Sequence, residues 1–335
     1  MDHAGGRLAK AEEHAQEALR RKLKSGERDE QLAQILTALG AIRLERGAAS
    51  KARKDALEAI DVLGDFEPPG ESRDVDRGRV RGLCLLGRCH IEEGNFAEAR
   101  PLLERALTLV QHCLEPVCEE LVEVLMAMGL LCQEAGYALE AEEYYRAALT
   151  ATETLHGPMC GEAATICQRL ALLAESAQDP ESLQPFAQRA YEIRCSDFGS
   201  GHPYTASAQS ALACVLDAIG EEREAGEKYL HAIAIFDQHL ASSHADECPL
   251  HPDMVRAYDQ CRRGAAKHLV AHGRAADARE FSTRAQQVIE RVFGRSHRFV
   301  ENCRRYHQAL QRAKGGGRKV SFSAWDWWRS LSFGR

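Results

Sequence analysis

The sequence predicts an all-α protein, a solenoid built from repeated helical hairpins. The clearest hairpin spans residues 119–158, where two amphipathic helices are joined by a turn at Gly136 and Tyr137. Four residues share the apolar face of its first helix: Leu125, Met128, Gly129 and Cys132. Such a hairpin cannot bury this face alone and needs copies stacked alongside it. Only 10 prolines and an aromatic content of 6% also favour helix over sheet.

Small residues recur at fixed positions and define the repeat. The position near the end of each second helix is occupied by Ala18, Ala59, Ala106, Ala148, Ala190, Ala232 and Ala285, and the four members from 106 to 232 are each 42 residues apart. An earlier position of the same helix holds Ala11, Ala52, Ala99, Ala141, Ala225 and Ala278, with Leu183 as the exception. The first helices carry Leu39-Gly40, Leu86-Gly87 and Met128-Gly129, and the turns carry Gly47, Gly94, Gly136, Gly220 and Gly273. We expect these small residues where two helices approach closely.

This pattern resembles the tetratricopeptide repeat, lengthened here from its usual size of about 34 residues. The added residues hold a recurring phrase before each new helix: LHGP at 155–158, FGSGHPYTA at 198–206, CPLHPDM at 248–254 and FGRSHRF at 293–299. On a 42-residue period this phrase is similar to the kinesin light chain class of these repeats. The resemblance covers about residues 7–300. It implies a right-handed α-solenoid whose first helices line a concave groove.

The repeat positions divide the chain into four predicted parts: an N-terminal half repeat or cap at 1–30, six repeats at 31–296, a capping helix at 297–313 and a flexible tail at 314–335. The first part matches a second helix with no first helix before it. It is therefore either a cap or the remainder of a longer array. Two links exceed the period, and their polar composition predicts longer loops at 64–78 and 239–254.

Composition argues against several classes of protein. The net charge of -7 disfavours a nucleic-acid binder with a basic face. The twelve cysteines form no CxxC pair and several fall on predicted core faces, which favours a reducing compartment over a disulfide framework. Because the chain also shows neither a signal peptide nor a long apolar run, we expect a cytoplasmic protein.

The sequence predicts no enzyme, and therefore no catalytic residue, cofactor or metal. It contains no GxSxG, no P-loop and no nucleotide-binding glycine fingerprint. His268 and His272 are four residues apart, but the glutamate of a zinc protease is missing between them. A cluster of ligand-type residues in the second long loop matches no standard zinc spacing: His239, His244, Cys248 and His251.

The predicted function is a non-catalytic adaptor or scaffold that binds a peptide or helix in the groove. Two alternatives stand beside it: a regulatory or targeting module whose Trp-rich C-terminal tail occupies its own groove or contacts a membrane, and a kinesin light chain-like cargo adaptor. Groove candidates are the first-helix residues not used for packing: Arg81, Cys84, Arg88, Glu123, Met126, Leu130, Gln168, Arg169, Leu172, Ser210, Arg263 and Lys267. An amide suits a peptide main chain because it donates and accepts at once. The two asparagines, Asn95 and Asn302, both lie outside this set.

The tail differs from the repeats because it combines basic residues with every tryptophan of the chain. Its ligand candidates are Trp325, Asp326, Trp327 and Trp328. The Trp-Asp-Trp phrase resembles the tryptophan-acidic cargo peptides that kinesin light chains recognise. Three roles stay open: an extra cap or disorder, a ligand for this groove or another protein, and contact with an anionic membrane.

Overall fold

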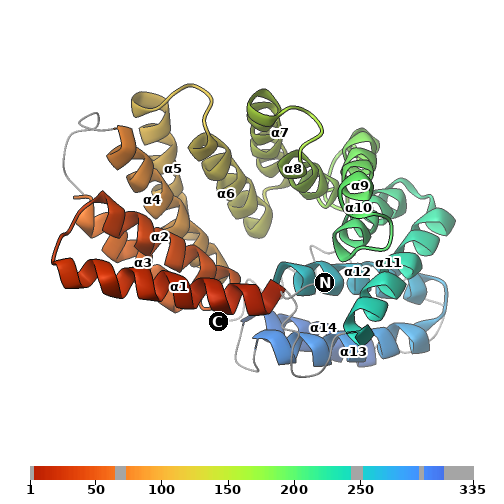
Figure 1. The fold of residues 1–335 in the computed structure, drawn as a ribbon. Helices are drawn as coiled ribbons and strands as arrows, with labels where there is room; N and C mark the ends of the chain where they lie inside the picture. The colour runs from red at the N-terminus through yellow and green to blue at the C-terminus, as the bar shows by residue number, and fades with distance from the viewer. Residues whose placement is uncertain (1–3, 65–72, 243–251, 294–297, 313–335) are drawn as a thin grey trace. The chain divides into compact units, whose positions relative to one another are not determined.

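The computed structural model describes residues 4–64, 73–242, 252–293 and 298–312, and these residues form α-helices and one short 3-10 helix without any strand (Figure 1). The predicted all-α fold is confirmed. The chain divides into two compact units, Met1–Pro158 and Met159–Arg335. We describe them separately as unit 1 and unit 2.

Unit 1 consists of a leading helix and three helical hairpins. Its helices are α1 (Ala4–Ser25), α2 (Glu30–Glu45), α3 (Ala49–Val62), α4 (Arg73–Glu93), α5 (Phe96–Cys113), α6 (Glu119–Ala135) and α7 (Ala138–His156). The first helices α2, α4 and α6 lie side by side, since α4 contacts both of the others. The second helices α3 and α5 pack against the first helix of the next hairpin. Buried apolar side chains between these packed helices form the core of the unit.

Unit 2 consists of three further hairpins and a final helix. Its elements are α8 (Gly161–Ala171), η1 (Glu181–Leu183), α9 (Gln184–Phe198), α10 (Pro203–Ile219), α11 (Glu222–Ser242), α12 (Pro252–Ala271), α13 (Ala275–Phe293) and α14 (Arg298–Arg312). The helix α8 has only 11 residues, and turns separate it from η1. The helix α10 contacts α8, α9, α11 and α12 and is buried along most of its length.

The predicted loop at 64–78 was too long, because α4 already begins at Arg73. The sequence there looks like a loop because it is polar, but Asp76 is only 1% exposed, and Arg79, just beyond the predicted loop, is 8% exposed. Arg79 donates to Asp76 at 3.2 Å and to the carbonyl of Leu63 at 3.0 Å. Because these contacts satisfy the charges of Asp76 and Arg79, the polar first turns of α4 can be buried. The loop predicted at 239–254 is shorter in the same way, since α11 continues to Ser242 and α12 begins at Pro252.

The turn glycines end the first helices by adopting the left-handed backbone conformation. The five glycines that the repeat predicts have φ between 75° and 91°: Gly47, Gly94, Gly136, Gly220 and Gly273. The residue after each of them donates its N–H to a carbonyl five residues earlier, at 2.8 Å in every case. This is the Schellman arrangement, in which glycine avoids the steric cost of a Cβ.

In the hairpins α4–α5 and α6–α7, a glycine on the first helix receives a large side chain from the second. Tyr145 of α7 is fully buried against Gly129 of α6, and a Cβ built on Gly129 would lie 2.5 Å from the ring. Leu103 of α5 packs in the same way on Gly87, where a Cβ would lie 2.7 Å away. Five other repeat positions are also buried: Gly40, Ala141, Ala148, Ala225 and Ala232. The repeated small residues therefore set how closely the helices pack.

We predict that Gly129→Leu lowers the free energy of unfolding by about 1–3 kcal/mol, because the added side chain must displace the Tyr145 ring. Urea unfolding of the full chain, followed by circular dichroism, gives the midpoint. Gly201→Ala is the control, since a Cβ there meets no atom within 4 Å. A Gly129→Leu midpoint equal to that of the unchanged protein would show that the helices are not in close contact at this position.

Candidate functional site

The predicted groove positions of unit 1 lie on the adjacent first helices α4 and α6. The thiol of Cys84 donates to the carbonyl of Glu123 at 3.5 Å, and Arg81 donates to Glu120 at 2.7 Å. These two contacts hold the helices side by side. We name the exposed and half-buried groove residues that remain the α4–α6 surface: Arg81, Arg88, Glu123, Met126 and Leu130.

Two of the predicted groove residues are buried and do not reach a ligand. Cys84 is 3% exposed and Ser210, on α10 of unit 2, is 4% exposed. In both cases a neighbouring first helix covers the side chain. Burial raises the pKa of the Cys84 thiol to about 12, so this sulfur stays protonated at neutral pH and is a poor nucleophile.

The arginines of the first half of α4 are held in ion pairs with unit 1 carboxylates. Arg73 lies 3.3 Å and Arg77 lies 3.5 Å from a carboxylate oxygen of Glu115. Arg77 and Arg81 lie 3.8 Å and 2.7 Å from the oxygens of Glu120, which is 2% exposed. Two guanidinium groups of α4 hold the buried Glu120 carboxylate in one position, so these ion pairs fix α4 against α6.

Arg88 and Glu123 carry charges that are not neutralised in this way. Both side chains are exposed, and neither forms a salt bridge with any residue that the structure describes. Crowding by surrounding protein raises the pKa of the Glu123 carboxyl, and the guanidinium groups of Arg81 and Arg88 oppose this effect. The α4–α6 surface therefore carries an exposed cation, Arg88, and an exposed anion, Glu123, which interact electrostatically beside the half-buried Met126 and Leu130.

The corresponding surface of unit 2 is bridged by side chains. Lys267 of α12 reaches past α10 to Glu175, in the turn after α8, at 3.1 Å, and it lies 3.6 Å from Asp217. On α8, Gln168 donates to Ser207 of α10 at 2.5 Å. Small residues on α10 let its neighbours approach this closely: Ser207, Ser210 and Cys214 are all less than 9% exposed. The two other predicted positions, Arg169 and Leu172, are half-buried.

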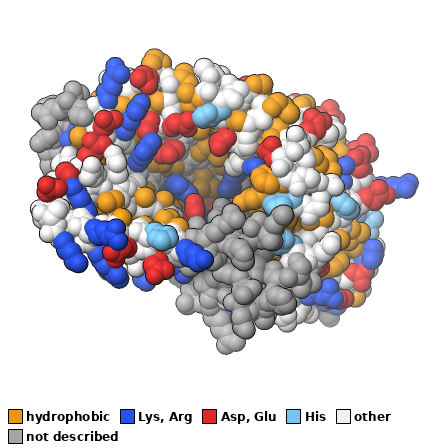
Figure 2. Space-filling model, viewed as in Figure 1, with side chains coloured by type: hydrophobic (Ala, Val, Ile, Leu, Met, Phe, Trp, Pro, Cys, Tyr) orange, Lys and Arg blue, Asp and Glu red, His pale blue; other side chains and the backbone are white. Residues whose placement is uncertain are grey.

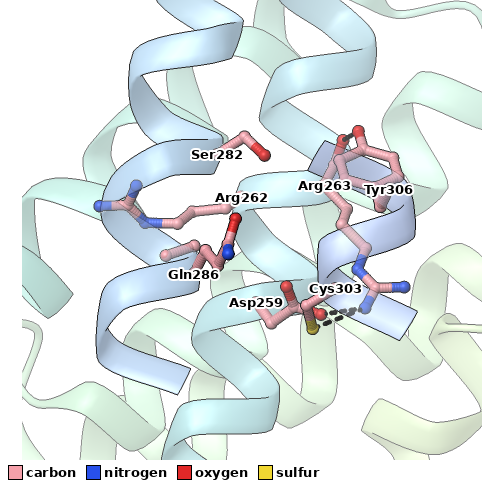
Figure 3. Close-up of a pocket in the computed structure, with 8 residues that line it drawn as sticks. Asp259, Arg262, Arg263, Ser282, Gln286, Cys303 and Tyr306 are labelled. Atoms are coloured by element: carbon pink, nitrogen blue, oxygen red, sulfur yellow. Dashed lines mark hydrogen bonds and ion pairs between the residues drawn. The ribbon is translucent and has the colours of Figure 1, made fainter. Parts of the chain in front are cut away.

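Arg263, the remaining groove candidate, belongs to the packing of the last three helices rather than to a ligand surface (Figure 3). Its guanidinium lies 2.5 Å from Asp259 and 3.3 Å from the sulfur of Cys303, and its carbonyl accepts from Tyr306 at 3.3 Å. The crevice beside these residues has a free volume of about 10 Å³, enough for about one water molecule. We therefore do not assign a ligand to it.

A histidine pair lies at the end of α12. The ring centroids of His268 and His272 are 4.3 Å apart, and their nearest carboxylates are Asp217 at 3.9 Å and Glu222 at 3.3 Å. Burial and the neighbouring His272 lower the pKa of His268. Among the described residues, no group of three or more His, Cys, Asp or Glu side chains is placed to hold a metal ion. The predicted metal-type loop cluster lies mostly outside the described residues.

The surface charge of unit 1 is mixed. Figure 2 shows Lys and Arg side chains interspersed with Asp and Glu over α1 and α2. None of the helices that the structure describes is both long and apolar enough to cross a membrane. The tail candidates Trp325, Asp326, Trp327 and Trp328 lie outside the described residues, so a groove or membrane role for them stays a prediction. The expected cytoplasmic location also stays a prediction.

Sequence reasoning missed the carboxylates Glu120 and Glu175, although the repeat period held a signal for the first. Hydrogen bonds that join adjacent first helices span 39 residues in three cases: Arg81 with Glu120, Cys84 with the carbonyl of Glu123 and Gln168 with Ser207. This separation is about one turn less than the 42-residue period. Glu175 had no such signal, because its contact with Lys267 spans 92 residues.

The comparisons with known proteins agree with the repeat pattern. The tetratricopeptide repeat family model matches residues 79–154. In sequence, the chain matches no curated protein. It is similar in fold to the nearly identical TPR-like repeats of a putative kinesin light chain from Podosopora anserina, at 16% identity over 62% of this chain and 96% of the other, with a TM-score of 0.52. The Rap conjugation gene regulator of plasmid pLS20, in complex with the Phr* peptide, is also similar in fold. The two share 14% identity over 86% of this chain and 70% of the other, with a TM-score of 0.62.

We predict that acid destabilises the protein partly through His268. Its pKa is lower in the folded state, so the folded protein binds this proton less readily than the unfolded chain, and stability falls as the pH drops below the unfolded value of about 6.5. His268→Gln should reduce the fall in melting temperature between about pH 7.5 and about pH 5. His14→Gln, at an exposed position of α1, is the control. Equal pH dependence in His268→Gln and the unchanged protein would contradict the prediction.

Proposed function

This chain is a tetratricopeptide-repeat protein, and from that premise we propose that it is a non-catalytic scaffold whose α4–α6 surface binds a peptide or helical segment of another protein. The surface lies inside the matched residues 79–154. The main observation behind the proposal is that α4 and α6 lie side by side and leave the five residues of the α4–α6 surface accessible to a ligand.

The surface combines apolar area with charge, which suits a protein segment. Met126 and Leu130 are half-buried, so a ligand that covers them removes apolar area from water. On the same helix, Met128 and Leu131 are 1% exposed and belong to the core against which Leu130 packs. A surface supported in this way needs little reordering when it binds, which lowers the entropic cost of association.

A likeness of fold supports the same class of function. The pLS20 Rap regulator, whose structure contains a bound peptide, has a TM-score of 0.62 to this chain. At 14% identity the likeness extends to the fold alone, so the identity of its ligand is not transferred. We take from it only that a helical array of this kind is able to hold a peptide.

We favour unit 1 over unit 2 as the binding surface. In unit 2, Lys267 and Glu175 close the space over α10, and three residues of α10 beneath them are almost fully buried. A ligand there has to break the ion pair before it reaches the first helices. In unit 1, Arg81 makes its ion pair along the helix contact and leaves Met126 and Leu130 accessible.

We predict that Met126→Lys with Leu130→Lys weakens peptide binding by about tenfold or more, roughly 1.4 kcal/mol. The reason is that each substitution places a charge where the ligand should bury apolar area. A library of random 12-residue peptides displayed on phage is first selected on the full chain, and the enriched peptides are then synthesised and titrated by fluorescence anisotropy.

Leu139→Lys provides the matched control, because Leu139 is 52% exposed and lies on the second helix α7 of the same unit. Its affinity should equal that of the unchanged protein. Equal weakening by the control and the surface variant would move the binding site elsewhere. An absence of saturable binding up to about 1 mM, roughly 4 kcal/mol of affinity, would reject the proposed function.

A further inference from the structure

We infer that Lys267 is a latch that keeps the first-helix surface of unit 2 closed, and that this surface becomes accessible when the ion pair between Lys267 and Glu175 breaks. The first helices of this unit are α8, α10 and α12. The inference concerns unit 2 alone, so it does not depend on the peptide-binding surface proposed in unit 1.

The ion pair joins the two neighbours of α10. Lys267 lies on α12, and Glu175 lies 92 residues earlier, in the turn after α8. The Nζ atom of Lys267 lies 3.1 Å from a carboxylate oxygen of Glu175 and 3.6 Å from one of Asp217, which belongs to α10. Because α10 contacts both α8 and α12, the lysine side chain crosses the first-helix surface at the middle helix.

The thiol of Cys214 lies next to this ion pair. Cys214 precedes Asp217 by about one turn of α10 and is 8% exposed. Burial raises the pKa of its thiol, and the charges of Glu175, Lys267 and Asp217 all interact with it. A side chain this close to both members of the pair is covered by them. Cys214 therefore reports whether the latch is closed.

The backbone on both sides of the pair is fixed, so only the lysine side chain has to move. Leu173 and Ala174, which directly precede Glu175, are 2% and 1% exposed and anchor the turn in the core. The side chain of Lys267 is 42% exposed and ends in a flexible chain of methylene groups. When the pair breaks, the ammonium group turns into water while the helices keep their positions.

The pair is fully charged at neutral pH, but water and ions reach it. Although burial opposes the charge of Lys267, the carboxylates of Glu175 and Asp217 raise its pKa overall, so the ammonium group stays protonated. The side chain of Glu175 is 28% exposed. An ion pair in such a position is only modestly stable and is weakened by salt. The latch therefore holds at low ionic strength and opens more often as the salt concentration rises.

The test is the rate at which iodoacetamide alkylates Cys214 in the folded full-length protein at fixed pH, measured for each cysteine separately by peptide mass spectrometry. Lys267→Ala removes the latch, and Lys267→Arg keeps a cation of similar reach. Lys228→Ala is the matched control, because Lys228 is also ion-paired in unit 2, with Glu224 at 3.2 Å.

We expect Lys267→Ala to raise the alkylation rate of Cys214 by about threefold or more, and Lys267→Arg and Lys228→Ala to leave it unchanged. Raising the salt concentration from about 50 to 500 mM should accelerate the reaction in the unchanged protein, because ions screen the pair. It should have little effect in Lys267→Ala, which has no pair to break.

The loss of charge alone predicts the opposite result. The ammonium group of Lys267 favours the thiolate of Cys214, so its removal without any opening would slow alkylation. An equal or lower rate in Lys267→Ala would therefore overturn the latch, as would a salt effect of the same size in that variant. Cys261 of α12, 0% exposed, is the internal reference. Equal acceleration of Cys214 and Cys261 would show that unit 2 unfolds rather than opens, and would also overturn the inference.

Discussion

The packing of a large side chain against a small residue is the interaction on which the rest of this structure depends. In the hairpin of α6 and α7, the ring of Tyr145 fills the space that Gly129 leaves, and Leu103 does the same over Gly87 in the preceding hairpin. Interiors pack too densely to absorb an added methyl group at such a contact. The distance between the two helices is therefore fixed in both hairpins.

The spacing of the hairpins sets a recurring sequence separation between contacting residues of adjacent first helices, and this separation decides which residues meet. Residues 39 apart in the sequence lie opposite each other on adjacent first helices, as Arg81 and Glu120 do in unit 1 and Gln168 and Ser207 do in unit 2. Arg81 meets the carboxylate of Glu120 because of this geometry, whereas Arg73 and Arg77 pair with Glu115 in the segment before α6.

The two units use this arrangement differently. In unit 1 the side chains of α4 and α6 pair along the contact between the helices, and the residues above it stay accessible. In unit 2 the shortened α8 is followed by a turn that carries Glu175 to Lys267, and the small residues of α10 lie beneath. A broken first helix and a helix of small residues are enough to change an open surface into a bridged one.

The sequence by itself determined the all-α class, the hairpin repeat and the turn glycines, because each is local: a glycine with positive φ ends a helix wherever the chain places it. The tertiary structure decided which groove candidates are accessible. Cys84, Ser210 and Arg263 have the right place in the repeat, but neighbouring helices cover or pair them. It also decided that residues 73–78 form helix rather than loop, since the burial of Asp76 depends on Arg79, which donates to Asp76 and to the carbonyl of Leu63. Exposure and pairing are properties of the surrounding helices, and a repeat pattern specifies only which residues face them.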